Sequence, residues 1–187
     1  MAIRVFPGDK LDLALEKSER NLPGVSVHPF RHEKQRPTNW CWAACISNGA
    51  SVFGDARGHS EMAEEVTGCL DCYPANPGEC CDVVWKLQHL EEAWSKCGYS
   101  AQLETGHLSL DELKVEIASN RPVQVHRESD VHYVLIVGWY LSGGVEMLVL
   151  GDPKFLSTRD VPYQALKDGV DEARWTSTVR NIHPKGS

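Results

Sequence analysis

The sequence lacks long hydrophobic runs and clusters of basic residues, and these absences exclude two classes of partner. No apolar stretch approaches the roughly 20 residues that a helix needs to cross a bilayer, so we expect no membrane partner. The formal net charge of -7 and the absence of a run of Lys and Arg argue against a nucleic-acid partner, because binding to phosphates depends on clustered cations. The sequence also contains no internal repeat and no low-complexity segment.

The first residues lack the apolar segment and the small-residue cleavage site of a secretory signal. Seven cysteines are nevertheless a high number for a cytoplasmic protein. The cysteine count therefore favours export and the missing signal opposes it, which leaves the compartment open. An exported protein would use a signal-independent route, or a signal that lies outside this sequence.

What is present is the composition of an ordinary globular protein. The 187 residues are 42% hydrophobic and 24% charged, which is enough for one domain with a substantial core. We expect a monomer with an N-terminal arm over residues 1–30 and a domain over residues 31–187. The domain would consist of a helical lobe to about residue 120 and a β lobe from about residue 121.

Seven cysteines are the number expected for three disulfide pairs and one free reactive thiol. Cys41 would be the free thiol, and the sequence does not fix the connectivity of the six others: Cys45, Cys69, Cys72, Cys80, Cys81 and Cys97. Two alternatives stay open. Most of the cysteines could be reduced and buried as small hydrophobic residues, or a structural zinc ion could be bound by Cys69, Cys72, Cys80 and Cys81. The preferred interpretation includes no metal and no cofactor.

Hydrophobic periodicity and stop signals predict helices in the first part of the chain and strands in the second. The helices are expected at residues 41–52, 60–66, 83–94 and 110–119, the last with a capping box formed by Ser109 and Glu112. The strands are expected at residues 122–127, 132–141, 145–150 and 174–182, with a hairpin turn at 142–144. A short helix within residues 11–17 and a helical turn at 163–167 complete the prediction. This order of helices and antiparallel strands indicates the α+β class.

Four residues are arranged as nucleophilic catalysis requires: Gln35, Cys41, His132 and Asp152. Cys41 opens the first clear helix, whose positive N-terminus is expected to lower the pKa of a thiol. His132 begins the longest apolar strand, and Asp152 follows the next strand. A thiolate nucleophile needs a histidine to take its proton, an acid to fix the imidazole tautomer and an amide to donate to the oxyanion.

Each of these residues also has a purely structural interpretation. A cysteine with apolar neighbours is often buried and inert, and an aspartate before a proline often only forms a turn. His126 and His107 are alternatives to His132, and the five other histidines are expected on the surface. We prefer His132 because the polar turn at residues 128–130 places its ring at the edge of the sheet.

The chain resembles the papain-like cysteine peptidases in three motifs, which are Asn39-Trp40-Cys41-Trp42-Ala43-Ala44 with Gln35 ahead of it, His132-Tyr133-Val134-Leu135-Ile136-Val137-Gly138, and Asp152-Pro153. It is similar to small bacterial members, such as the peptidase domains of bacteriocin exporters and the effector proteases of plant pathogens. The resemblance spans roughly residues 30–183. It implies two lobes, with the nucleophile on a central helix of one lobe and the histidine and acid across a cleft in the β lobe. It also implies an oxyanion hole formed by Gln35 and the backbone N–H of Cys41.

The sequence departs from this pattern at two positions. Asp152 stands where plant papains have an asparagine, as it does in the bacterial relatives. Trp40 precedes the nucleophile where papain has a small residue, which would narrow the approach to Cys41.

We therefore expect a cysteine peptidase that acts on a peptide or protein substrate through an ion pair of the Cys41 thiolate and the His132 imidazolium. The same triad could instead deamidate a glutamine side chain or transfer its acyl group to an amine, as in a transglutaminase, because fold and geometry do not fix the acceptor. A non-catalytic binding module is a weaker third alternative. The resemblance leaves the biological role open.

Overall fold

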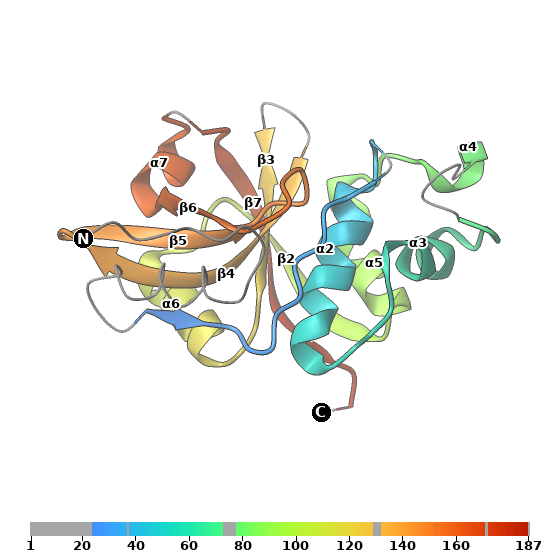
Figure 1. Ribbon diagram of the computed structural model, residues 1–187, viewed down its shortest axis with the longest axis horizontal. Coiled ribbons are helices and arrows are strands. Elements are labelled where there is room, and N and C mark those ends of the chain that lie inside the picture. The colour runs from blue at the N-terminus through green and yellow to red at the C-terminus, as the bar shows by residue number, and fades with distance from the viewer. Residues whose placement is uncertain (1–23, 37, 73–77, 129–131, 171, 187) are drawn as a thin grey trace, which may run out of the picture.

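The computed structural model describes residues 24–36, 38–72, 78–128, 132–170 and 172–186 (Figure 1). An antiparallel sheet occupies one side of the molecule, and the helices of residues 41–96 gather on the other side. The short helix expected within residues 11–17, and most of the expected N-terminal arm, lie outside the described residues.

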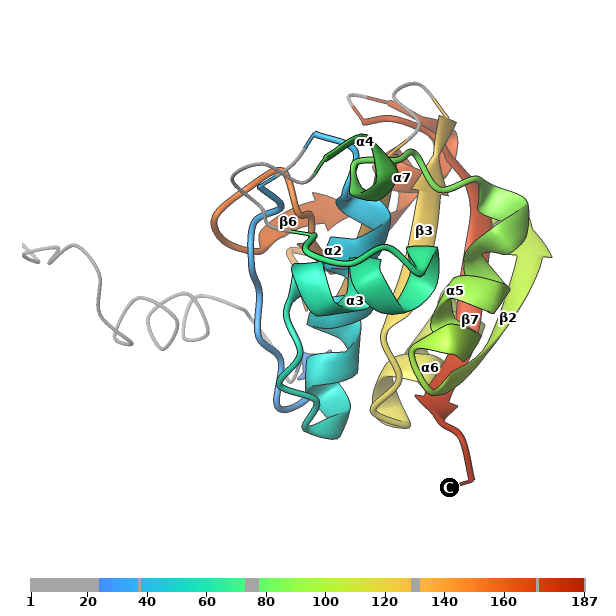
Figure 2. The same ribbon diagram turned by 90° about the vertical axis from the view of Figure 1, so that its right-hand side faces the viewer.

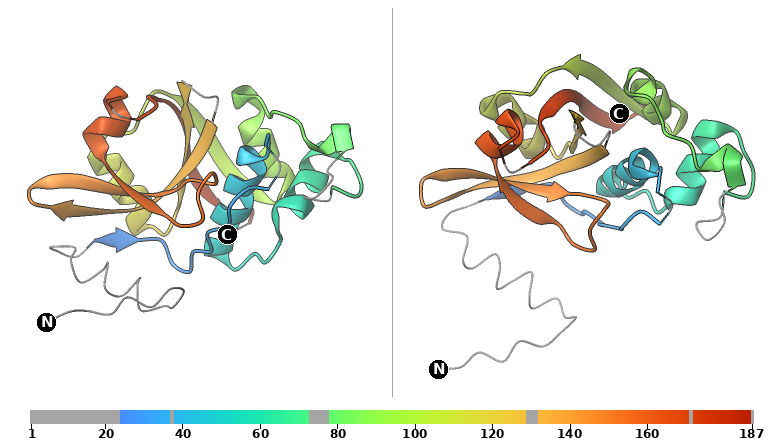
Figure 3. Two further views of the ribbon diagram at one scale, coloured as in Figure 1. Left: turned by 45° about the horizontal axis from the view of Figure 1, so that its top comes forward. Right: turned by 90° about the horizontal axis from the view of Figure 1, so that it is seen from above.

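The described strands form one antiparallel sheet with the order β2-β7-β3-β4-β5-β6, and β1 also pairs with β4. Their bounds are Val25–Ser26 for β1, Tyr99–Thr105 for β2, Val123–Arg127 for β3, His132–Ser142 for β4, Val145–Gly151 for β5, Arg159–Pro162 for β6 and Trp175–Pro184 for β7. The sheet is strongly curved, as Figure 3 shows.

The longest strand, β4, is the element that positions one side of the site. Its first half pairs with β3, where Arg127 faces His132, and its second half pairs with β1, where Ser26 faces Gly138. It continues into β5 through a turn in which Gly143 and Gly144 have φ values of 55° and 83°, a conformation that favours glycine. His132 is therefore the first residue of a central strand and lies where β3 ends.

The helix α2, Cys41–Ala50, positions the other side of the site, and all ten of its residues are buried. Small side chains allow this close packing: a Cβ added to Gly49 would lie 2.7 Å from Cη2 of Trp94. A 3-10 turn, η1 (Ser51–Phe53), extends the helix and ends at Gly54, whose φ is 83°. Seen along its axis in Figure 3, α2 lies between the sheet and the helix α3.

The other helices are short and cover the flanks of α2 and of the sheet. They are α3 (His59–Thr67), α4 (Gly78–Cys81), the 3-10 turn η2 (Leu87–His89), α5 (Leu90–Lys96), α6 (Leu110–Ala118) and α7 (Tyr163–Asp168). Figure 2 shows α3 on the side of α2 that faces away from the sheet, and α5 beside β7 and β2. Ser109 caps α6 by accepting from the backbone N–H of Glu112, while Glu112 accepts from the backbone N–H of Ser109.

The predicted α+β class is confirmed, and most of the predicted elements are present within one or two residues of their expected bounds. The helix expected from residue 83 begins only at Leu90, because tertiary donors use the carbonyls before it: Val83 accepts from the Trp42 indole and Trp85 from the Tyr133 hydroxyl. The strands β2 and β6 were not predicted. β1 lies inside the range expected to be an N-terminal arm, and β2 lies inside the range expected to be the helical lobe, between two predicted helices.

The expectation of three disulfide pairs is wrong, because the structure contains two pairs and three free cysteines. Cys69 pairs with Cys80, and Cys72 pairs with Cys81. Cys45 and Cys97, which were expected to pair, are buried thiols like Cys41. Burial raises the pKa of both, for Cys97 to about 12. They behave as small hydrophobic residues, which is the alternative interpretation of the cysteine count.

The zinc alternative is also overturned, because the four cysteines it needed are consumed by the two disulfides. Among the described residues, no group of three or more His, Cys, Asp or Glu side chains could hold a metal ion. None of the helices in the described ranges has both the length and the apolar character of a membrane span.

Candidate active site

Cys41 is the first residue of α2 and lines a cavity of about 230 Å³. Its side chain is 8% exposed. The same cavity is lined by His132, so the two residues predicted to exchange a proton share one enclosed space. The other lining residues are Thr38, Asn39, Val84, Trp85, Tyr133 and Lys154.

The residues that flank Cys41 are held by the segment that follows the disulfides. Trp40 donates its indole N–H to the carbonyl of Cys81 at 2.8 Å, and Trp42 donates to the carbonyl of Val83 at 2.9 Å. The backbone N–H of Asn39 donates to Oδ1 of Asp82 at 3.2 Å. The start of α2 is thus fixed by side chains on both sides of the nucleophile.

The pKa of the Cys41 thiol is raised above its ordinary value of 9.0, because the side chain is buried. The backbone N–H groups of Tyr133 and Trp42 and the charge of Lys154 lower it, but burial outweighs them. The first backbone N–H groups of the helix do lower this pKa, as expected, but burial gives a net shift in the opposite direction. A raised pKa favours the protonated thiol at neutral pH.

His132 is 2% exposed, and its Nε2 lies 2.7 Å from Oδ1 of Asp152. The two rival histidines make other contacts. His126 hydrogen-bonds to Thr176 through Nδ1 at 2.9 Å, and the ring of His107 lies edge-on to that of Trp175. Of these three histidines, His132 is the one that lines the cavity with Cys41.

Asp152 is fully buried and follows β5 directly. Burial raises the pKa of this carboxyl, but the hydrogen bond from His132, the backbone N–H of Lys154 at 3.0 Å and the charge of Arg127 outweigh it and lower the pKa. Asp152 is consequently a carboxylate, and Nε2 of His132 must be the donor in their hydrogen bond.

Two arginines lie behind Asp152 and were not found in the sequence. Arg127 and Arg159 each approach Oδ2 of Asp152 at 3.5 Å, and both also pair with Glu172. No local motif marks the two arginines or Glu172, because they are far apart in the sequence. Arg127 lies in β3, Arg159 in β6 and Glu172 in the segment before β7. Their positive charges help to keep a buried carboxylate ionised.

Gln35 lies one loop away from Cys41. Its backbone N–H donates to the carbonyl of Pro153 at 2.8 Å, and its side-chain Nε2 donates to the carbonyl of Thr38 at 2.8 Å. Since Thr38 lines the cavity of Cys41, Gln35 bridges the Asp152-Pro153 turn and the loop that leads into α2. The amide thus stands at the rim of the site.

Three residues that line the cavity also escaped the sequence patterns. Lys154 could have been found from its position two residues after Asp152. Val84 and Trp85 could not, because both lie in the range expected to be a helix, and that helix begins only at Leu90.

The comparisons with known proteins identify a family and a fold. The profile of the Peptidase_C39 like family matches residues 27–182. No curated protein matches the chain. Among solved structures, the chain is similar to the peptidase domain of Streptococcus ComA, a bi-functional ABC transporter involved in quorum sensing, at 16% identity and a TM-score of 0.59, covering 83% of this chain and 99% of that one.

Two further structures have the same fold. One is a double glycine motif protease from an AMS/PCAT transporter, solved in complex with the leader peptide, at 10% identity and a TM-score of 0.54, covering 88% of this chain and 100% of that one. The other is digestive procathepsin L 3 of Tenebrio molitor larval midgut, at 12% identity and a TM-score of 0.53, covering 86% of this chain and 71% of that one. At these identities the likeness shows the fold.

Proposed function

Because this chain belongs to the Peptidase_C39 like family, we propose that it hydrolyses peptide bonds with Cys41 as nucleophile, His132 as base and Asp152 as the acid that orients the base. One observation carries this proposal. Cys41 and His132 line the same cavity, and His132 is hydrogen-bonded at 2.7 Å to a buried carboxylate.

The positions of the protons on His132 and Cys41 determine how the reaction begins. Since Nε2 of His132 donates to Asp152, a neutral ring carries its lone pair on Nδ1, which can accept a proton. Cys41 is a thiol before substrate binds, because burial raises its pKa. The proton therefore moves from sulfur to Nδ1 as the sulfur attacks, and the preformed ion pair expected from the sequence is replaced by general-base catalysis.

In the acylation step, Sγ of Cys41 forms a bond to the scissile carbonyl carbon, and the π electrons move onto the oxygen. When this intermediate collapses, the C–N bond breaks and His132 gives its proton to the departing amine. In the second half, water loses a proton to His132 and attacks the thioester, which releases the acid and the thiol. Asp152 stabilises the imidazolium in both halves.

The oxyanion would be held by the backbone N–H of Cys41 and by Nε2 of Gln35. In the free protein, this Nε2 donates to the carbonyl of Thr38. The NH2 group of Gln35 has two hydrogens, so one can stay bonded to Thr38 while the other donates to the oxyanion.

The test is cleavage of an unbiased peptide library by the wild-type protein and by single variants. Cys41→Ala and His132→Ala should remove cleavage, while Gln35→Ala should lower kcat by about 10²–10³-fold, because one oxyanion donor is lost. Cys45→Ala is the matched control: this thiol is buried on the same helix, one turn later, and should be dispensable.

Mass spectrometry of the intact substrate identifies the reaction. Peptide hydrolysis splits the substrate, whereas deamidation shifts its mass slightly and transfer to an amine adds mass. Cleavage by Cys41→Ala equal to that of the wild type would refute the assignment of the nucleophile.

A further inference from the structure

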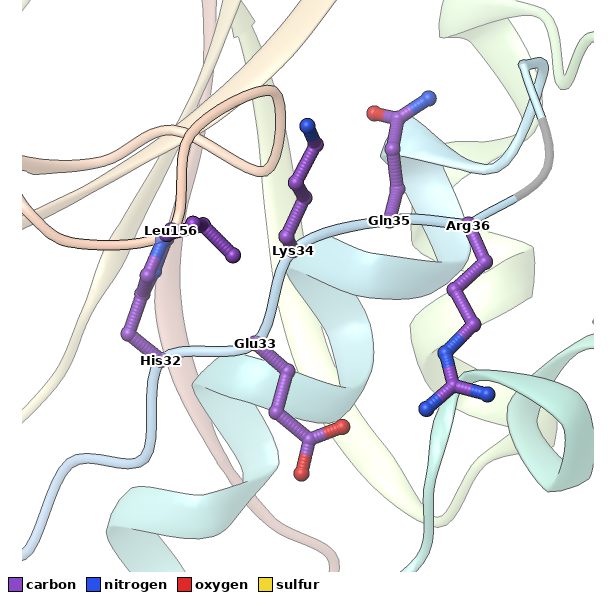
Figure 4. Close-up of a pocket in the computed structure, with 6 residues that line it drawn as sticks. All are labelled: His32, Glu33, Lys34, Gln35, Arg36 and Leu156. Atoms are coloured by element: carbon purple, nitrogen blue, oxygen red, sulfur yellow. The ribbon is translucent and has the colours of Figure 1, made fainter.

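A second and larger cavity lies beside the first. It encloses about 630 Å³ and is more open to solvent. It is shown in Figure 4 and is lined by His32, Glu33, Lys34, Gln35, Arg36 and Leu156. None of these residues except Gln35 has a part in the chemistry proposed above.

The two cavities adjoin along two stretches of backbone. Gln35 lines the second cavity and donates to Thr38, which lines the first. Lys154 lines the first cavity, and Leu156, two residues later, lines the second. A peptide that passes Cys41 in an extended form would therefore continue from one cavity into the other.

The segment that lines the second cavity is well anchored. Asn48 of α2 donates to the carbonyl of Glu33 at 2.9 Å and accepts from its backbone N–H at 3.2 Å. The backbone N–H of Gln35 is tied to Pro153. The side chains of this segment therefore project from a fixed backbone, with Lys34 and Gln35 pointing to one side and Glu33 and Arg36 to the other (Figure 4).

The rim of the two cavities carries more positive than negative charge. Lys34 and Arg36 line the second cavity, and Lys154 lines the first. Glu33 is already paired with Arg31, whose Nε lies 3.1 Å from its carboxylate. Burial lowers the pKa of His32, so this ring adds no charge at neutral pH. Such a concentration of cations is notable in a chain whose net charge is -7.

We propose that the substrate is an acidic peptide segment whose carboxylates pair with Lys154 at the first cavity and with Lys34 and Arg36 at the second. This proposal rests on the function proposed above and names the class of its substrate. The cations would select acidic sequences and attract them to a protein that otherwise repels negative charge.

The test uses a peptide that the wild-type protein cleaves, resynthesised with Asp and Glu, or with Asn and Gln, at each position on both sides of the cleaved bond. Two carboxylates at positions that reach the second cavity should raise kcat/KM by roughly tenfold. This is the combined effect expected of two solvent-exposed ion pairs of ordinary strength. The preference should shrink at about 0.5 M NaCl, because salt screens exposed charges.

Charge reversal provides the matched variants. The double variant Lys34→Glu and Arg36→Glu should shift the preference from acidic to basic peptides. Lys167→Glu, which makes the same kind of change on α7 and lines neither cavity, should leave the preference of the wild type unchanged. Labelling by iodoacetamide at Cys41, with Cys45 and Cys97 protected, checks that the double variant is folded.

Equal kcat/KM for acidic and neutral peptides in the wild type, at low salt, would overturn the proposal even if the double variant failed to fold. A different result would contradict the proposed function itself. In that case the wild type would cleave no peptide faster than Cys41→Ala does.

Discussion

At the level of single residues, burial has opposite outcomes for the two ionisable groups on either side of His132. It raises the pKa of the Cys41 thiol, because it outweighs the backbone N–H groups and the charge of Lys154 that act in the opposite direction. The Asp152 carboxyl is buried more completely and is still ionised, because His132, Lys154 and Arg127 compensate. The histidine therefore stands between a proton donor and a fixed negative charge.

This arrangement predicts how Cys41 reacts in the free protein. The rate of its alkylation by iodoacetamide should rise steadily from about pH 7 to about pH 10, because the thiolate forms only as the pH approaches a raised pKa. Mass spectrometry of the intact protein measures the rate. The Cys41→Ala variant should remain unlabelled, since Cys45 and Cys97 are more deeply buried than Cys41 and do not line its cavity. A rate that is already constant near neutral pH would reveal a preformed ion pair.

Three of the four candidate site residues follow a local signal in the sequence, and Gln35 was identified from its place ahead of Cys41 in the family motif. Cys41 begins a helix, His132 begins a strand and Asp152 precedes a proline. The pKa direction of Cys41 could not be predicted, because it depends on how much of the molecule packs over the sulfur. The roles of Arg127 and Glu172 could not be predicted either, because only the tertiary structure brings these residues close to Asp152.

At the level of elements, the segment Cys81–Trp85 connects the disulfide region to both sides of the site. Its carbonyls accept from Trp40 and Trp42 of the nucleophile segment and from Tyr133 of β4. It starts at a cysteine that is bonded to Cys72. The disulfide therefore anchors one end of a segment that both sides of the cavity hold in place.

Removing each disulfide by serine substitution should separate stability from activity. Cys72→Ser with Cys81→Ser, and Cys69→Ser with Cys80→Ser, should each lower the free energy of unfolding by about 3 kcal/mol, because the closed loops are of similar length. Only the first pair should also lower kcat/KM, since Cys81 carries the carbonyl that holds Trp40. Urea unfolding and peptide cleavage measure the two effects. Equal losses of activity in both double variants would contradict a specific role for Cys81.

Elements with strong local chemistry were predictable, and elements that depend on distant partners were not. The capping box at Ser109 and the two-glycine turn at 143–144 specify α6 and the β4–β5 hairpin within a few residues. The strand β2 has a mixed pattern of burial and is formed by its pairing with β7, about 75 residues later.

At the level of the whole molecule, this member of the Peptidase_C39 like family joins its helical side to its sheet through a small network around Asp55. Asp55 pairs with Arg57 and accepts from the Tyr99 hydroxyl at 2.9 Å, at the start of β2. Arg57 in turn donates to the carbonyl of Cys97 at 2.6 Å, directly after α5. The network joins the end of α2 to the junction of α5 and β2.

The network predicts how stability depends on acid. Hydrogen bonds from Arg57 lower the pKa of Asp55 from 3.8 to about 2. A carboxyl whose pKa is lower in the folded state stabilises the fold above its unfolded pKa, and this contribution disappears as the pH falls through the folded pKa. The free energy of unfolding should therefore fall between about pH 4 and about pH 2, with Asp152 adding to the same trend.

Urea unfolding at a series of pH values tests this linkage. Asp55→Asn should be less stable than the wild type at pH 7, and its stability should vary less below pH 4. Parallel curves for the two proteins would show that Asp55 has the same pKa in the folded and unfolded states.

The contact between the tilted rings of Trp85 and Trp42, whose centroids lie 5.2 Å apart, has a consequence for the way the protein can be observed. One of these indoles lines the cavity of the nucleophile, and the other follows the nucleophile in the helix. Indole emission responds to the polarity and the quenching groups around it. Occupancy of the cavity is thereby coupled to the intrinsic fluorescence of the molecule, which serves as a built-in reporter and needs no attached dye.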